Sequence, residues 1–163
     1  MTIFFVPTMA VDKPTKQARF MVWGGVGAGK STLIQALTRP EISRVRKTQT
    51  IAYQEVAIDT PGEYAERGYL RQSLQATAFD ARVLVVVQDA TRSTSFFPPN
   101  YFLMFPQPVI GVVSKTDLAT GAQVERATRL LRQIGVVGEI FNVSAINGSG
   151  LDQLRQSLST YLE

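Results

Sequence analysis

The stretch Gly24-Gly25-Val26-Gly27-Ala28-Gly29-Lys30-Ser31-Thr32 fits the phosphate-loop pattern G-x-x-x-x-G-K-[ST] with every fixed position filled. It follows a short apolar run at residues 19–23 and leads into residues 33–37, so it lies where a buried strand turns into a helix. Glycines let successive backbone N–H groups converge on one point, and the positive end of the following helix is directed at the same point. The stretch therefore predicts a site for the phosphates of a nucleotide.

Each part of this loop has an expected role. We expect Lys30 to reach the β- and γ-phosphates and the hydroxyl of Ser31 to ligate Mg²⁺, which keeps most of its waters. The remaining residues of the loop, from Gly24 to Thr32, are expected to surround the phosphates with their backbone amides. On the pattern alone, a glycine-rich strand-to-helix turn with an incidental lysine is the alternative interpretation.

The composition fits one globular domain and excludes several kinds of site. The chain has 163 residues, of which 45% are hydrophobic and 18% charged. Cysteine is absent, which excludes disulfides and thiolate metal sites and favours a cytoplasmic location. Histidine is absent too, so any chemistry must use carboxylates, hydroxyls, amides, Lys, Arg or a metal. A net charge of +4 suggests affinity for polyanions only weakly, and no apolar stretch approaches the ~20 residues of a membrane span.

Strand and helix patterns alternate along the chain from residue 19 onward. Apolar, mostly β-branched runs predict strands at residues 20–23, 56–58, 83–87, 109–113 and 140–143. Apolar spacing predicts helices at residues 30–38, ended by Pro40, and around two later sets: Val124, Ala127, Leu131 and Ile134, then Leu151, Leu154, Leu158 and Tyr161 behind a Ser149 cap. This order predicts a three-layer α/β/α P-loop NTPase domain, similar to small GTPases, at residues 19–163. Its mostly parallel sheet is expected to end in an abbreviated edge strand between Thr50 and Asp59.

Two segments do not follow this alternation. Residues 1–18 carry Pro7 and Pro14 and are interpreted as an extended arm or, alternatively, a targeting segment. Residues 92–108 contain four prolines around an aromatic cluster at residues 101–105, so any helix there is expected to be short. We expect these aromatic side chains to lie in the core rather than to form a binding surface.

The segment Asp59-Thr60-Pro61-Gly62 fits the D-x-x-G element of P-loop NTPases. Asp59 is expected to hold Mg²⁺ through a water, and the N–H of Gly62 to donate to the γ-phosphate and register its presence. Alone, this tetrapeptide is also a good turn sequence. Upstream, the interval Lys47-Thr48-Gln49-Thr50 is where GTPases place a mobile segment whose threonine completes the Mg²⁺ shell. We assign this role to Thr48 and place Thr50 at the start of the edge strand.

The segment Ser114-Lys115-Thr116-Asp117 resembles the guanine-binding motif of GTPases, which is usually Asn-Lys-x-Asp. The Asp117 carboxylate can accept two hydrogen bonds from guanine, whereas adenine lacks both donors. The stem of Lys115 is expected to cover one face of the base, and Ser114 gives a shorter polar anchor than the usual Asn. The alternative is an aspartate that caps a helix after a strand. Further on, Ser144-Ala145 resembles the element whose backbone N–H meets the guanine carbonyl.

These motifs, in this order, resemble the ethanolamine/propanediol utilisation (EutP/PduV) family of small GTPase-like proteins encoded with bacterial microcompartments. The residues that carry the resemblance are Arg46-Lys47-Thr48-Gln49, Asp59-Thr60-Pro61-Gly62-Glu63-Tyr64 and Ser114-Lys115-Thr116-Asp117. Even Ser114 suits this family, and the resemblance covers about residues 19 to 163. It implies a P-loop GTPase fold, GTP or GDP with Mg²⁺ as ligands, and association with a microcompartment shell or enzyme. For residues 1–18 it keeps the targeting segment as an alternative to the extended arm.

Two residues depart from better-known GTPases. Glu63 stands after the D-x-x-G element, where many GTPases place a glutamine that orients the attacking water. A carboxylate there is repelled by the triphosphate, so we expect slow intrinsic hydrolysis, with Lys30, Thr48, Gly62 and Glu63 as the residues nearest the chemistry. Gly27 lies where potassium-activated relatives of Era have Asn, so potassium is not expected to stimulate the reaction.

Three functions from different classes fit the motifs. The first is a nucleotide switch with weak GTPase activity, whose moving parts are residues 44–50 and 61–71. The second is an ATP-dependent kinase that passes the γ-phosphoryl group to a small acid such as acetate, which the phosphate loop serves equally well. The third is an RNA-binding factor that uses Arg39, Arg44, Arg46 and Lys47, although such a charge run is more often a solvated face, and we do not expect a nucleic-acid partner.

Overall fold

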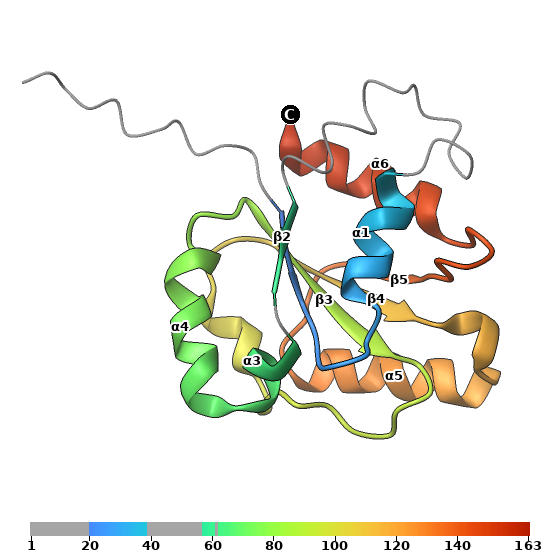
Figure 1. The fold of residues 1–163 in the computed structure, drawn as a ribbon, viewed down its shortest axis with the longest axis horizontal. Coiled ribbons are helices and arrows are strands. Elements are labelled where there is room, and N and C mark those ends of the chain that lie inside the picture. The colour runs from blue at the N-terminus through green and yellow to red at the C-terminus, as the bar shows by residue number, and fades with distance from the viewer. Residues whose placement is uncertain (1–19, 39–56, 61) are drawn as a thin grey trace, which may run out of the picture.

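The computed structural model describes residues 20–38, 57–60 and 62–163, which form a five-stranded sheet between two layers of helices (Figure 1). The strand order is β2-β1-β3-β4-β5, and every neighbouring pair is parallel. The strands are β1 (Phe20–Trp23), β2 (Ala57–Asp59), β3 (Val83–Asp89), β4 (Val109–Ser114) and β5 (Ile140–Asn142). Because all strands run the same way, their carboxyl ends meet at one edge of the sheet, where nucleotide sites of such folds lie.

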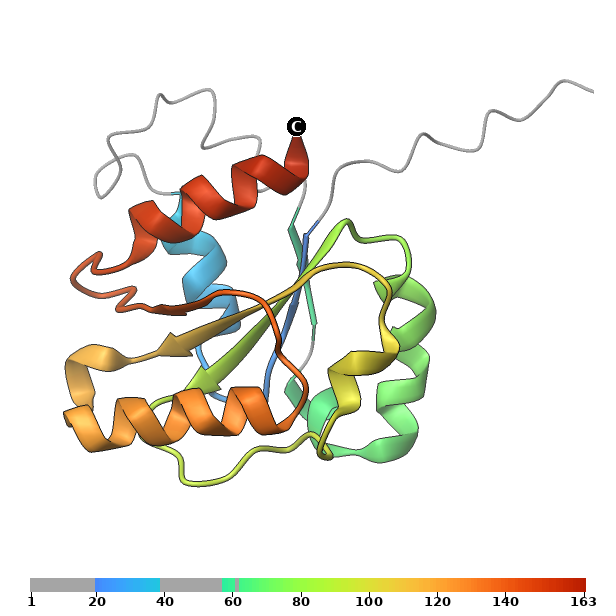
Figure 2. The ribbon, with the colours of Figure 1, turned by 180° about the vertical axis from the view of Figure 1, so that it is seen from behind.

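Helices α1 (Lys30–Thr38) and α6 (Leu151–Leu162) cover one face of the sheet, and α4 (Gly68–Ala78) and α5 (Gly121–Gln133) cover the other (Figures 1 and 2). Alternate residues of a strand point to opposite faces, and β1 follows this rule. Phe20 and Val22 pack toward α1 and α6, whereas Met21 and Trp23 pack toward α4 and α5. The two apolar cores hold the sheet from both sides and fix the edge that carries the predicted motifs.

Trp23 lies at the centre of an aromatic cluster on the α4 and α5 side. Its ring centroid is 5.7 to 6.1 Å from those of four aromatic residues, namely Phe97, Tyr101, Phe102 and Phe105. Three of these four are buried, which confirms that the cluster belongs to the core, while the neighbouring Leu103 and Met104 are exposed. The predicted short helix is the four-residue 3₁₀ helix η1 (Tyr101–Met104).

Most predicted elements agree with the structure to within one residue, and the larger differences lie at three places. Strand β3 extends two residues beyond the predicted run, to Asp89. The predicted Ser149 cap is wrong: α6 has Gly150 at its N-cap, with φ of 77° and no capping side chain, because only glycine adopts this conformation readily. Helices α3 (Gly62–Glu66) and α4 fill the segment between β2 and β3, where the sequence predicted no regular element.

Several predictions lie outside the described residues. These are the arm at residues 1–18, the start of the edge strand, and the mobile segment with Thr48 and Thr50. Strand β2 itself has three residues, as expected for an abbreviated edge. Within the described ranges, no helix has both the length and the apolar character needed to span a membrane.

Candidate nucleotide site

The phosphate loop connects the end of β1 to the start of α1, as the pattern predicted. Gly27 and Gly29 have φ values of 73° and 89°, in the left-handed region that favours glycine. The N–H of Ala28 donates to the carbonyl of Gly25 at 3.2 Å, which closes the turn, and the N–H of Leu33 donates to Gly29 at 2.8 Å, which starts the helix. The loop thus has the backbone conformation that an anion-binding loop requires.

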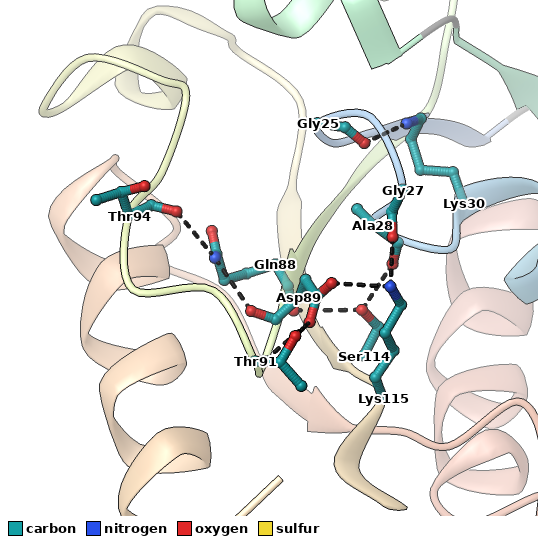
Figure 3. A network of polar contacts seen from close by, with 10 residues as sticks. All are labelled: Gly25, Gly27, Ala28, Lys30, Gln88, Asp89, Thr91, Thr94, Ser114 and Lys115. Carbon is teal, nitrogen blue, oxygen red and sulfur yellow. Dashed lines mark hydrogen bonds and ion pairs between the residues drawn. The ribbon is translucent and has the colours of Figure 1, made fainter. Parts of the chain in front are cut away.

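Lys30 lies over this loop rather than in solvent. Only 7% of the residue is exposed, and its Nζ donates to the carbonyl of Gly25 at 2.9 Å (Figure 3). A cavity of about 530 Å³ opens beside it, lined on one side by loop residues that include Lys30, Ser31 and Thr32. Its other side is lined by Thr60, Gly62 and Glu63. The cavity therefore joins the two motifs that were expected to act on the phosphates.

The D-x-x-G segment contacts the loop through its backbone. Asp59 is the last residue of β2 and pairs with Val22 of β1. The buried hydroxyl of Thr60 donates to the carbonyl of Val22 at 2.8 Å, which ties the segment to the strand before the loop. A Cβ at Gly62 would lie 2.6 Å from the N and Cα atoms of Val26, so only glycine fits here without a shift. The main chain of Gly62 is thus held against the wall of the phosphate site.

Two glutamates of α3 lie near the phosphate site, one at the cavity and one against the loop. Glu63, the residue singled out in the sequence, is exposed and lines the cavity. Glu66 was not predicted: its Oε1 accepts a hydrogen bond from the N–H of Val26 at 3.1 Å. Val26 and Glu66 are 40 positions apart in the sequence, and no sequence pattern indicates such a contact. Two carboxylates therefore stand where a triphosphate would bring further negative charge.

The Ser-Lys-Thr-Asp motif is hydrogen-bonded to the other side of the loop (Figure 3). The hydroxyl of Ser114 donates to the carbonyl of Ala28 at 2.7 Å, so serine is long enough to make this connection. The next residue, Lys115, has φ of 59° and sends its Nζ to the carbonyl of Gly27 at 2.6 Å. The end of β4 and the phosphate loop are therefore joined at two consecutive loop residues.

Asp117 and Ser144, which are predicted to bind the base, meet at the carboxyl ends of β4 and β5. Asp117 is exposed and lies within the short 3₁₀ helix η2 (Thr116–Leu118), where its Oδ1 accepts from the Ser144 hydroxyl at 2.9 Å. Ser144 is fully buried and also accepts from the N–H of Asn147, while the half-buried Ala145 follows it. The N-cap of η2 is Lys115, so the alternative of Asp117 as a capping residue is wrong.

Asp89 belongs to the same network but was missed, because the apolar run that defined β3 ends at Val87. The residue is only 4% exposed. Its Oδ1 accepts from the N–H and hydroxyl of Thr91 at 2.8 and 2.6 Å, and its Oδ2 pairs with Lys115 Nζ at 2.9 Å. Burial by itself would raise the pKa of this carboxyl, but the hydrogen bonds from Thr91 and Lys115 outweigh it and hold the pKa below its ordinary value.

The chain after β3 covers the remaining side of the loop. A Cβ at Gly25 would lie 2.3 Å from the ring of Phe96, so this ring packs directly on the loop and requires glycine there. The Arg92 guanidinium stacks over the Phe96 ring at 5.3 Å from its centroid. Of the expected site residues, the loop, Gly62, Glu63, Ser114, Lys115, Asp117, Ser144 and Ala145 thus lie along one edge of the sheet. Thr48 lies outside the described residues.

Comparison with known proteins agrees with this arrangement. The family model described as "Ethanolamine utilisation - propanediol utilisation" matches residues 17–160. The propanediol utilization protein PduV of Citrobacter freundii is 35% identical over 83% of this chain and 89% of its own length. A probable acetate kinase EutP of Salmonella typhimurium is 34% identical over 86% of this chain and 88% of its own length. GTPase Era of Maricaulis maris is 29% identical over 91% of this chain and 58% of its own length.

Solved structures show the same fold. Translation elongation factor SelB of Methanococcus maripaludis, in complex with a GTP analogue, superposes with a TM-score of 0.64 at 21% identity. The match covers 90% of this chain and 34% of SelB. The cytosolic domain of the T. maritima FeoB iron transporter gives a TM-score of 0.57 at 18% identity, over 90% and 64% of the two chains. The three-layer P-loop NTPase fold is therefore confirmed, and on its sequence this chain belongs to the PduV/EutP ethanolamine and propanediol utilisation family.

Proposed function

We propose that this protein binds guanine nucleotides with Mg²⁺, hydrolyses GTP slowly, and acts as a nucleotide switch. One observation carries the proposal: Lys115, two residues before the base-binding Asp117, is hydrogen-bonded to the phosphate loop at Gly27. A base held at Asp117 and phosphates held by the loop would thus belong to one continuous site. The relationship to GTPase Era and the fold shared with SelB support guanine as the base.

Discrimination between bases would rest on Asp117. Its carboxylate can accept from the ring N–H and the exocyclic amine of guanine, while the Ser144 hydroxyl on Oδ1 fixes its direction. Adenine offers neither donor at these positions. An unsatisfied polar group costs about 1–3 kcal/mol, which is a factor of roughly 5 to 150 in affinity.

The phosphates would be held by the loop and by Lys30. Ser31, in the first turn of α1, lines the same cavity as Lys30 and has a hydroxyl oxygen of the kind that Mg²⁺ prefers. Asp59 at the end of β2 and Thr48 complete the proposed metal ligands. Mg²⁺ would there neutralise charge that develops on the β- and γ-phosphates. The N–H of Gly62, held against Val26, is the proposed sensor of the γ-phosphate.

Slow hydrolysis is proposed from Glu63. Its exposed carboxylate at the mouth of the cavity repels the γ-phosphate and replaces the neutral amide that orients water in other GTPases. Single-turnover GTP cleavage by Glu63→Gln and Glu63→Ala tests this. Both variants are expected to stay within about tenfold of the unmodified protein, because a group that does not act on the water contributes little to the barrier. A hundredfold loss in both would make Glu63 catalytic.

The binding of nucleotides tests the function as a whole. Isotherms for GTP, GDP and ATP, each with Mg²⁺, are expected to show tight binding of both guanine nucleotides and at least about tenfold weaker binding of ATP. The control is the isotherm of the Asp117→Ala variant with ATP, because this variant lacks the carboxylate that discriminates guanine from adenine. A clear preference of the unmodified protein for ATP would overturn the assignment.

A second candidate is an ATP-dependent kinase for a small carboxylic acid. It is favoured by relatives such as the Salmonella typhimurium protein, named as a probable acetate kinase, at 34% identity. The same isotherms separate the two, together with an assay for ADP release that depends on added acetate. We prefer the GTPase because the network at Asp117 and Ser144 would have no purpose in a site that binds adenine.

The proposed cellular setting follows from the family. Relatives named for propanediol utilisation suggest a cytoplasmic protein that associates with the shell or an enzyme of a bacterial microcompartment. Residues 1–18 are proposed as the targeting segment. A fusion of residues 1–18 to a fluorescent protein is expected to join such compartments, and diffuse fluorescence beside compartments marked by a shell protein would contradict the proposal.

A further inference from the structure

The buried Asp89 has no role in the site as proposed so far, although it contacts one of that site's main residues. It is the last residue of β3 and is not among the residues that line the phosphate cavity. A carboxylate at 4% exposure is costly to bury unless it is paired and hydrogen-bonded. Within the described residues, the partners of the Asp89 carboxylate are Thr91, which donates two hydrogen bonds, and Lys115, which forms an ion pair.

The pairing fixes the position of the Lys115 ammonium. Its Nζ donates to the Gly27 carbonyl at 2.6 Å and to Asp89 Oδ2 at 2.9 Å, so two of its three donors are used on two different partners (Figure 3). The backbone of Lys115 is in the left-handed region at φ 59°, which turns the side chain from the end of β4 toward the loop. A long lysine side chain with free rotamers would sample many positions, and this clamp removes most of them.

Thr91 in turn fixes Asp89. Both of its hydrogen-bond donors, the backbone N–H and the hydroxyl, go to Oδ1, which leaves Oδ2 directed at the lysine. The order of contacts is therefore Thr91 to Asp89, Asp89 to Lys115, and Lys115 to Gly27 of the phosphate loop (Figure 3). The neighbouring bond from Ser114 to Ala28 runs beside this chain and joins the same two segments.

We propose that Asp89 is a positioning residue for nucleotide binding, which holds Lys115 across the phosphate loop so that its stem covers the base without further ordering. This rests on the proposed binding of guanine nucleotides at the same site. Asp89 acts through Lys115 and touches neither base nor phosphate, so GDP and GTP would be affected alike. Because its pKa is lowered, the Asp89 carboxyl is ionised at any pH above the ordinary value of 3.8. The ion pair with Lys115 is lost only as the pH falls through the lowered pKa.

The first measurement is the affinity for GDP of the full chain and its Asp89→Asn variant. Asparagine keeps the shape and can still accept from Thr91, but it removes the charge that holds the ammonium. We expect the Kd for GDP and for GTP to rise by about tenfold each, and by the same factor at every pH from about 5 to 8. Asp152→Asn is the control, because Asp152 pairs with Arg155 at the same 2.9 Å within α6 and is not among the residues that line the phosphate cavity, so it is expected to leave GDP affinity unchanged.

A double-mutant cycle separates positioning from general stability. Lys115→Met keeps the aliphatic stem and removes the ammonium, and it is also expected to weaken GDP about tenfold. If Asp89 acts through Lys115, the double variant is about tenfold weaker rather than a hundredfold weaker. Thermal stability is measured for all four proteins, and its changes are not expected to follow this pattern.

Each outcome decides the proposal. If the unmodified protein binds no GDP, the proposed function itself fails. If it binds GDP but Asp89→Asn stays within twofold, binds GDP more tightly, or adds fully to Lys115→Met, the positioning role is overturned while the function stands. Should Asp89→Asn fail to fold, Thr91→Val removes only the hydroxyl that anchors Asp89, and a GDP affinity about threefold weaker supports the clamp, whereas unchanged affinity refutes it.

Discussion

The two walls of the phosphate loop are built differently. On the base side, Ser114 and Lys115 make hydrogen bonds of 2.6 to 2.7 Å to consecutive loop carbonyls, supported by the buried Asp89. On the opposite side, the hydrogen bond from α3 that the described residues show is an exposed one of 3.1 Å between Glu66 and Val26, beside the close approach of Gly62. The bond from Ser114 is buried, whereas the bonds from Lys115 to Gly27 and from Val26 to Glu66 are exposed. Exposed polar contacts contribute about 0–1 kcal/mol and buried networks are costly to break, so the base side is held mainly through Ser114 and the buried Asp89.

We propose that this difference assigns nucleotide recognition to the base side and switching to the α3 side. A rigid base side can select the nucleotide without moving, since its hydrogen bonds exist before the ligand arrives. In the proposed switch, α3 would leave or approach the loop as the γ-phosphate comes and goes, and breaking its exposed bond to Val26 would cost little free energy. Changes on the base side should therefore affect all guanine nucleotides, and changes on the α3 side should affect GTP and GDP differently.

The largest effect is expected from Asp117→Asn. The amide offers a donor where guanine also has a donor, so affinity for GDP and GTP should fall by about a hundredfold, and xanthine nucleotides should bind more tightly than guanine nucleotides. Isotherms with GDP and XDP check this. An equal loss for both bases would mean that Asp117 serves folding and not base selection.

A smaller and selective effect is expected from Gly62→Ala. The added methyl group would collide with Val26, so α3 should be displaced and GTP should bind about tenfold more weakly while GDP stays within about twofold. Gly121→Ala is the control, because a Cβ at this first residue of α5 meets nothing within 4 Å. If both nucleotides weaken equally, the segment is not specific to the γ-phosphate.

A weaker change in the opposite direction is expected from Glu66→Gln. Glutamine can still accept from the Val26 N–H, but one negative charge near the γ-phosphate is gone, so GTP should bind about two- to threefold more tightly and GDP should change less. The exposed Glu125 on α5 provides the control substitution to Gln. The gain should shrink in high salt, and a gain that persists there would not be electrostatic.

The smallest effect is expected from exchanging sodium for potassium. Gly27 has no side chain to ligate a cation, and a Cβ there would meet only Arg92, at 3.7 Å. Single-turnover GTP hydrolysis should therefore differ by less than about twofold between the two buffers, as for a reaction whose barrier the ion does not change. A clear rate increase in potassium would show that another group supplies the ligand.

Much of the fold and site follows from local sequence patterns. The phosphate loop and the bounds of β1 and α1 agree with the prediction, because the glycines, the lysine at its place in the loop pattern and a buried apolar strand are all local signals. The pairing of Asp117 with Ser144 follows once β4 and β5 are known to be parallel neighbours. Because all strands are parallel, motifs that follow different strands lie together at one edge of the sheet.

The failures have physical causes as well. An apolar run does not reveal Asp89, because β3 continues beyond Val87 through two buried polar residues. Gln88 donates to the backbone carbonyl of Asp89, and the Asp89 carboxylate accepts from Thr91 and Lys115. Side-chain chemistry favours Ser149 as the N-cap of α6, but the positive φ at the cap position requires a glycine, which is Gly150. The Glu66 contact joins residues 40 positions apart across a tertiary interface, which no local pattern encodes.

The position of Trp23 gives the protein a built-in optical reporter. It is the single tryptophan of the chain, fully buried among four aromatic rings, and the next residue is Gly24 of the phosphate loop. Its indole N–H has no hydrogen-bond partner within the described residues, so the ring is shielded from polar quenching. Its emission should shift to longer wavelength on unfolding, and its intensity should follow the occupation of the loop without any attached dye.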